Sequence, residues 1–259
     1  MTRWAIGVVL MMPGTAFTQD VHTIIQQSVE ATDRDWKAAP GYDYSQQVRA
    51  NGGTKTYEVM MIMGSPYERL TAVNNRPLTA QQQAREQQKL DLVIKQRRNE
   101  SPQQKNQRVA RYVKEQQQNH LLIDQLTRAF EFTLEGEQKL DSRDVYVFRA
   151  RPRPGYRPPN LQASVLKGMQ GRLWVDKGTF QWVKVEAEVI HPVTIEGFLA
   201  RVEPGTRFEL EKAPVGEGIW LPKHFAMRSR SKVLFLVPHK NLEEETYWGY
   251  RKAASEQGQ

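Results

Sequence analysis

Residues 171–190 read GRLWVDKGTFQWVKVEAEVI and carry the clearest hairpin pattern in the sequence. Two strand-like halves flank residues 176–179, an Asp-Lys-Gly-Thr sequence that favours a tight turn. In the second half, Val183 and Val185 alternate with charged residues, as expected for a strand with one buried face. The stretch therefore predicts an antiparallel β-hairpin.

The same period of two continues on both sides of the hairpin. Further strands are expected at residues 42–44, 54–63, 67–73, 131–140, 144–150, 194–202, 206–212, 220–230, 232–237 and 244–252. Turn residues separate these segments, and no internal repeat is visible. This spacing predicts a mainly β protein of the α+β class, built on an antiparallel sheet or a half-open barrel.

Helical patterns interrupt the strands in two places. Residues 21–29 carry apolar side chains at helical spacing after Asp20, which can cap a short helix. Residues 78–129 predict a helical insertion, read as a helical hairpin followed by a docked helix, with Ser101 and Pro102 starting a helix. Within residues 80–119, twelve Gln, nine Lys or Arg and four Asp or Glu give a local charge of 9 − 4 = +5.

Composition excludes several kinds of site. The 259 residues contain no Cys, so a disulfide framework, a thiol nucleophile, a Cys-type zinc site and an iron–sulfur cluster are ruled out. The net charge of +8 raises the question of an anionic partner. In residues 151–159, the run RPRPGYRPP predicts an extended basic loop, because proline fixes φ and removes hydrogen-bond donors.

The first residues are typical of an export signal. Arg3 precedes an apolar run over residues 4–12, which is too short for a membrane span, and small residues follow the helix breakers Pro13 and Gly14. We expect a signal peptide over residues 1–18 and one domain over residues 19–259. Without a Cys for lipid attachment, the expected product is a soluble periplasmic protein that is not lipid-anchored. A buried N-terminal strand or helix is the alternative.

No catalytic constellation is visible, so we expect a protein that is not an enzyme and holds no cofactor or metal. Ser65 lies in a Gly-Ser-Pro turn with no helix behind it, and no glycine pattern for phosphate precedes a helix. A metal enzyme would require His191, His224 and His239 to converge in space. No nucleic-acid-binding motif surrounds the basic helices, so contact with a membrane surface is the better explanation of their charge.

Two motifs carry a family resemblance. The segments GRLWVD (171–176) with QWVKVE (181–186), and YWGYRK (247–252), resemble the hairpin and the closing strand of the LolA/LolB-like outer-membrane lipoprotein-sorting superfamily. The resemblance implies a half-open barrel whose concave face, covered by helices, holds acyl chains. It also implies a gating arginine, for which Arg49 in an early strand is a candidate.

The leading hypothesis is therefore non-covalent binding of a lipid or lipoprotein acyl chain by a carrier or sorting protein. The residues expected to line the cavity are Met61, Met63, Leu173, Val175, Val183, Val185, Leu122, Leu126 and Phe130. The residues expected to meet headgroups at its rim are Arg49, Arg97, Arg98, Arg108 and Arg111. A sensor or scaffold of the same fold, which binds an inner- or outer-membrane partner protein through the helical insertion, is the alternative.

Overall fold

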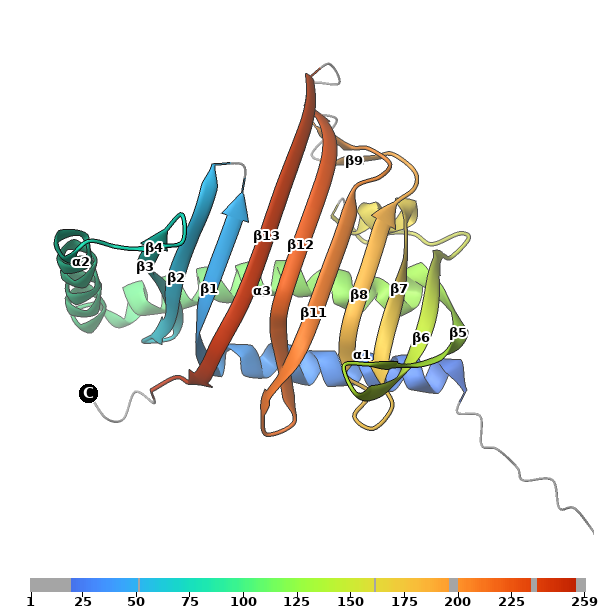
Figure 1. Cartoon of the computed structure of the whole chain (residues 1–259), viewed down its shortest axis with the longest axis horizontal. Coiled ribbons are helices and arrows are strands. Elements are labelled where there is room, and N and C mark those ends of the chain that lie inside the picture. The colour runs from blue at the N-terminus through green and yellow to red at the C-terminus, as the bar shows by residue number, and fades with distance from the viewer. Residues whose placement is uncertain (1–19, 51, 161, 196–199, 234–236, 255–259) are drawn as a thin grey trace, which may run out of the picture.

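The computed structural model describes residues 20–50, 52–160, 162–195, 200–233 and 237–254, so the expected signal segment lies outside the described residues. Within them, one large antiparallel sheet arches over two long helices (Figure 1). The helical elements are α1 (Val21–Ala38), η1 (Ala39–Gly41), α2 (Ala80–Arg98), α3 (Pro102–Ala129) and η2 (Gln162–Gly168). The strands are β1 (Tyr42–Ala50), β2 (Gly53–Ile62), β3 (Ser65–Val73), β4 (Arg76–Pro77), β5 (Phe130–Leu140), β6 (Arg143–Pro152), β7 (Met169–Asp176), β8 (Trp182–Val189), β9 (Val193–Ile195), β10 (Ala200–Val202), β11 (Arg207–Gly216), β12 (Ile219–Val233) and β13 (Val237–Lys252).

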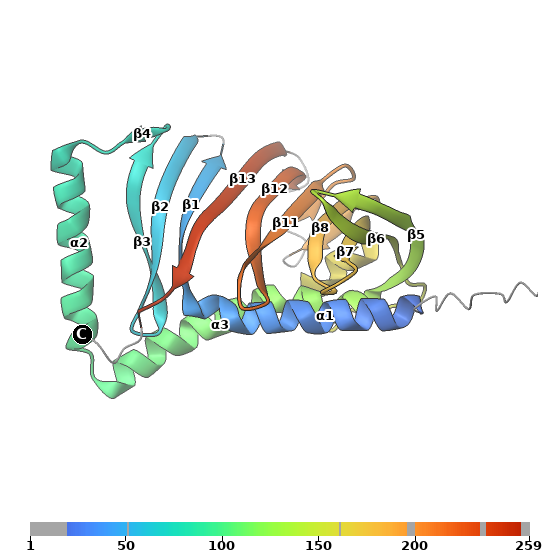
Figure 2. The same cartoon turned by 60° about the horizontal axis from the view of Figure 1, so that its bottom comes forward.

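The order of the strands leaves the sheet open. It runs β4-β3-β2-β1-β13-β12-β11-β8-β7-β6-β5, and the short β10 pairs with both β9 and β12. The end strands β4 and β5 do not pair with each other in the described chain, so the sheet curves without closing (Figure 2). The predicted fold class, an open curved antiparallel sheet with helices, is confirmed.

Helix α1 is longer than the sequence pattern predicted. Its buried side continues past Val29 through Ala31, Thr32 and Asp35, and the helix ends at the short η1 turn, which contains Pro40. Asp20 occupies the N-cap position, but its side chain makes no capping hydrogen bond.

The insertion contains two helices in the described chain, not three. Thr79 starts α2 and Ser101 starts α3, each with a capping box in which the side chain accepts from the backbone of the third helical residue. The expected second and third helices form one continuous α3, because no Pro or Gly interrupts the chain between Pro102 and Ala129. Helix α2 stands at the β3 edge of the sheet, and its C-terminal end meets the start of α3 (Figure 2).

The predicted hairpin is formed by β7 and β8, with one irregularity. Trp174 pairs with Lys184, but Val175 pairs with Trp182, so Val183 is an extra residue in β8. This bulge changes the alternation, and Trp182 takes the place on the buried face that a regular strand would give to Val183.

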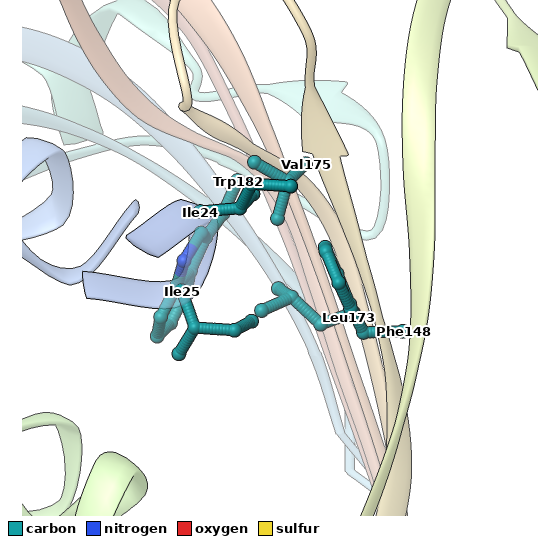
Figure 3. Close-up of a cluster of buried hydrophobic side chains, with 6 residues drawn as sticks. All are labelled: Ile24, Ile25, Phe148, Leu173, Val175 and Trp182. Carbon is teal, nitrogen blue, oxygen red and sulfur yellow. The ribbon is translucent and has the colours of Figure 1, made fainter. Parts of the chain in front are cut away.

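The main core lies between α1 and the strands β6 to β8. Ile24 and Ile25 of α1 point toward Phe148, Leu173, Val175 and Trp182 (Figure 3). Ile123 and Leu126 of α3 pack against the same cluster. Both helices therefore lie on one face of the sheet, which we call the helix-side face, and the opposite face is the outer face.

Candidate ligand-binding site

The helix-side face carries a continuous apolar row across the sheet. The strand register places the following side chains side by side, from β5 to β12: Leu134, Phe148, Leu173, Val185, Leu210 and Phe225. Alternation along β8 and β11 adds a second row with Ala187 and Phe208, which are also paired.

The helices cover this face unevenly. Phe148 and Leu173 are buried under α1, whereas Val185, Leu210 and Phe225 stay only half-buried. An apolar surface of this kind, backed by a rigid sheet and flanked by helices, is suited to holding an apolar ligand. We call these half-buried residues, together with Phe208, the apolar strip.

Beyond the apolar strip, toward β1 and β13, the helix-side face becomes rich in tyrosine. The rings of Tyr44 and Tyr250 have centroids 5.3 Å apart, and the centroids of Tyr44 and Tyr247 are 5.9 Å apart. Burial raises the pKa of Tyr44 to about 12 and raises the pKa of Tyr247 and Tyr250 as well. The three hydroxyls are therefore protonated at neutral pH, so this end of the face is uncharged at these rings but able to form hydrogen bonds.

The outer face is charged. Glu135 pairs with Arg149 and Arg172, and Lys184 pairs with Glu186 and Glu209 at 2.8 and 2.9 Å. A shallow hollow of about 760 Å³ runs over this face, but opposite charges alternate along it. Such paired charges are typical of a solvated sheet surface.

The predicted cavity residues divide between different parts of the fold. Leu173, Val175, Val185 and Leu126 meet in the cluster beneath α1, and Phe130 joins Leu126 in a neighbouring cluster.

The other predicted cavity residues lie elsewhere. Val183 packs instead with Trp174 and Trp220, because of the bulge in β8. Met61 is half-buried near the end of β2, Met63 follows it in the β2–β3 turn, and Leu122 lies in α3. Contact of all these residues with a ligand stays a prediction.

The five predicted rim arginines do not surround one opening. Arg97 donates hydrogen bonds to the carbonyls of Ile62 (2.7 Å) and Ser65 (2.8 Å), and its pKa is lowered by burial and by the nearby Arg108. Arg108 donates to the Met63 carbonyl at 3.1 Å and pairs with Glu100.

These contacts tie α2 and α3 to the β2–β3 turn. Arg49 pairs with Glu244 at 3.3 Å on the outer face, and Arg98 and Arg111 are exposed on the insertion.

Two polar networks on α1 escaped sequence reasoning. Asp35 is buried against Lys212 of β11, and it also accepts from the Trp220 backbone nitrogen at 2.9 Å. The only sequence signal for this network was an acidic residue, Asp35, at a position that continues the buried spacing of α1.

The second network is centred on a histidine of α3. His120 contacts Asp124 at 3.3 Å and Asp33 at 3.2 Å, and its ring stacks on Trp36 with centroids 4.2 Å apart. The His120 site joins α3 to α1, and the buried Nδ1 atom of His120 has no hydrogen-bond partner in the described chain.

Among the described residues, no group of three or more His, Cys, Asp or Glu side chains is placed to hold a metal ion. His224 lies on the outer face beside Glu244, and the side chain of His239 is outside the described set. None of the described helices has the length and apolar character needed to cross a bilayer.

Comparison by sequence finds no matching family model and no matching curated protein. Comparison of structures finds a LolA superfamily protein from Nitrosomonas europaea, 12% identical over 90% of this chain and 93% of that chain, with a TM-score of 0.34. A DUF1329 family protein from Desulfovibrio piger is 10% identical over 93% of this chain and 95% of its own, with a TM-score of 0.36. A domain assigned to outer membrane lipoprotein sorting, from Vibrio parahaemolyticus, is 10% identical over 91% and 94% of the two chains, with a TM-score of 0.33. These similarities include the family that the sequence motifs resemble, but at such scores no functional conclusion for this chain follows from them.

Proposed function

We propose that this protein binds a lipid or lipoprotein acyl chain non-covalently on its helix-side face, as a soluble periplasmic carrier. The observation that carries the proposal is the apolar strip, where Val185, Leu210 and Phe225 lie in one cross-strand row and remain half-buried. A carrier or sorting role is the role of the family that the two sequence motifs resemble.

Such binding requires no reactive group in the protein, because burial of apolar surface supplies the free energy. Each buried CH₂ group contributes about 0.8 kcal/mol, so a long acyl chain along the strip gains enough to stay bound while the rest of its molecule remains in water. The neighbouring tyrosine hydroxyls of Tyr44 and Tyr250 offer polar contacts where the aliphatic surface ends.

A matched pair of aromatic residues provides the test. Phe225 belongs to the strip, whereas Trp248 lies on the outer face of the neighbouring strand β13 and is 44% exposed. We expect Phe225→Ala to weaken binding of a fluorescent fatty acid about tenfold, because the lost contact contributes about 1.5 kcal/mol. Trp248→Ala should bind like the unmodified chain.

Native mass spectrometry of the protein isolated from an envelope extract gives an independent reading. A bound species with the mass of a lipid, present in the unmodified chain and in Trp248→Ala, supports the proposal. Recovery without any bound lipid, together with no binding of the fluorescent fatty acid, contradicts it.

A partner protein bound through the insertion is a second candidate function. Helix α2, which stands at the β3 edge of the sheet (Figure 2), exposes 58% of Leu92, and α3 exposes 41% of Val113. Substituting Leu92→Asn and Val113→Asn together should abolish capture of a membrane partner and leave fatty-acid binding intact. The reverse outcome favours the carrier.

A further inference from the structure

A second hollow, of about 760 Å³, lies at the end of the sheet where β6 ends, β7 begins and β8 ends. Its walls come from the proline-rich loop after β6, from the end of η2 and from the residues that follow β8, near the yellow η2 turn in Figure 1. We call this hollow the basic cradle. Its basic lining residues are Arg151, Arg153, Arg157, Lys167 and His191.

Positive charge predominates in the described lining of the basic cradle. No Asp or Glu is among the described residues that line it. Within the described part of the chain, Arg151, Arg157 and Lys167 form no ion pair, although Glu131 lies opposite Arg151 in the β5–β6 register. The outer face differs in this respect, since its arginines and lysines alternate with carboxylates. Unbalanced cations around one hollow repel each other until an anion binds among them.

The loop wall of the cradle is held in place before any ligand binds. The backbone nitrogen of Arg153 donates to the Ala129 carbonyl at 2.7 Å, and its guanidinium donates to the Phe130 carbonyl at 3.1 Å. Gly155 adopts a φ of 78°, a left-handed turn that brings Arg153 and Arg157 to the same hollow. Because the loop is anchored to the end of α3, it loses little conformational entropy when a ligand binds.

The opposite wall is also fixed. The backbone nitrogens of Ile190 and His191 donate to the Gly168 carbonyl at 2.7 and 3.2 Å. A Cβ atom at Gly168 would lie 2.5 Å from the His191 carbonyl oxygen, so only glycine permits this approach. Lys167, which precedes Gly168, and His191 are thereby held close to each other at the hollow.

We propose that the basic cradle binds a phosphate group. Guanidinium groups donate pairs of N–H bonds that match phosphate oxygens, and a lysine ammonium adds a further donor. Three arginines and a lysine around one hollow favour an anion with several oxygens and more than one charge over a single carboxylate. The hollow is larger than one phosphate group needs, so it accepts a phosphate carried on a larger body, either soluble or part of a lipid headgroup. This proposal stands independently of acyl-chain binding on the helix-side face.

Two variants of equal charge separate the cradle from the general positive charge of the chain. The cradle variant carries Arg151→Gln, Arg157→Gln and Lys167→Gln. These three residues are exposed and form no ion pair with another described residue. The control carries Arg76→Gln, Arg85→Gln and Lys95→Gln, which are exposed at the β3–α2 end of the fold. Equal melting temperatures of the two variants show that both are folded. The variant Arg157→Glu repeats the binding measurement with a single substitution.

Titration calorimetry with inorganic pyrophosphate, and sedimentation with phosphatidylcholine vesicles that contain or lack phosphatidic acid, identify the source of the phosphate. Pyrophosphate binding that weakens at least tenfold in the cradle variant and in Arg157→Glu, but not in the control, supports the proposal with a soluble ligand. The same pattern with phosphatidic acid vesicles alone supports it with a lipid headgroup. Equal losses in the cradle and control variants, or no binding of either probe by the unmodified chain, would overturn it.

Discussion

The ammonium of Lys212 in β11 is buried directly against the carboxylate of Asp35 in α1. Asp35 also accepts hydrogen bonds from Gln181 Nε2 at 3.1 Å and from the Trp220 backbone nitrogen at 2.9 Å. Burial lowers the pKa of Lys212, while the charge of Asp35 opposes that change. One carboxylate on α1 thus connects three separate parts of the sheet.

Breaking this pair is expected to destabilise the fold strongly. Lys212→Met leaves the Asp35 carboxylate buried without its counter-ion, and the free energy of unfolding in urea should fall by about 3–5 kcal/mol. Lys223→Met is the matched control, because Lys223 pairs with Glu211 on an exposed surface and should contribute less than about 1 kcal/mol. Equal losses in the two variants would show that burial of the Asp35 pair has no special importance.

Stability should depend on pH through Glu58. Burial alone would raise the pKa of this carboxyl, but hydrogen bonds from Arg251 and Arg69 lower it overall below its ordinary value of 4.5. The unfolded chain therefore binds the proton more readily, and the stabilisation is complete above pH 4.5 and is lost as the pH falls through the lower folded-state pKa.

The Glu58 contribution can be isolated by comparison with a variant. Glu58→Gln should be less stable than the unmodified chain by about 1 kcal/mol at neutral pH, and the difference should shrink as the pH falls toward 3. Glu217, which is 73% exposed beside Lys252, provides Glu217→Gln as a control with little effect at any pH. A Glu58 difference that grows on acidification would contradict the assignment.

Arg97 is expected to fix the insertion to the sheet. Its guanidinium donates to three carbonyls of the β2–β3 turn, those of Ile62, Ser65 and Pro66. Arg97→Met leaves these acceptors without their donor, which costs about 1–3 kcal/mol, and limited proteolysis should cut α2 faster. The adjacent and exposed Arg98 gives the control Arg98→Met, whose cleavage rate should not change.

Gly171 opens the motif of the hairpin for a steric reason. A Cβ atom built there would lie 2.3 Å from the Glu186 carbonyl oxygen in the paired strand β8. Gly171→Ala should therefore lower the melting temperature through a loss of about 1–3 kcal/mol. Gly41→Ala is the control, because a Cβ at Gly41 meets no atom within 4 Å. If the two variants have the same melting temperature, close packing does not explain why position 171 is a glycine.

Features encoded over short distances along the chain were predictable. The β7–β8 turn is fixed by Asp176, whose side chain accepts from the backbone nitrogens of Gly178 at 3.0 Å and Thr179 at 2.8 Å. The start of α3 at Ser101 follows from its capping box in the same way. Local hydrogen bonds of this kind leave a clear pattern in the residues themselves.

Features that depend on contacts between distant segments were not predictable. Alternation in β8 gives no sign of the bulge at Val183, which depends on its register with β7. The basic loop at residues 151–159 was visible, but its convergence with Lys167 and His191 arises only after β7 and β8 pair. The partner of Asp35 lies 177 residues away, beyond the reach of any spacing rule.

The pairing of β1 with β13 has a consequence for how the protein comes to be folded. Tyr42 lies opposite Lys252, so the first strand of the sheet is completed by the last one. Until the final sixteen-residue strand Val237–Lys252 is available, the ribbon β1–β4 and the ribbon that ends at β12 each have an unpaired edge where they should join. A chain without β13 therefore has two sheets, each with an unpaired edge, and the whole arch assembles only after β13 has been synthesised.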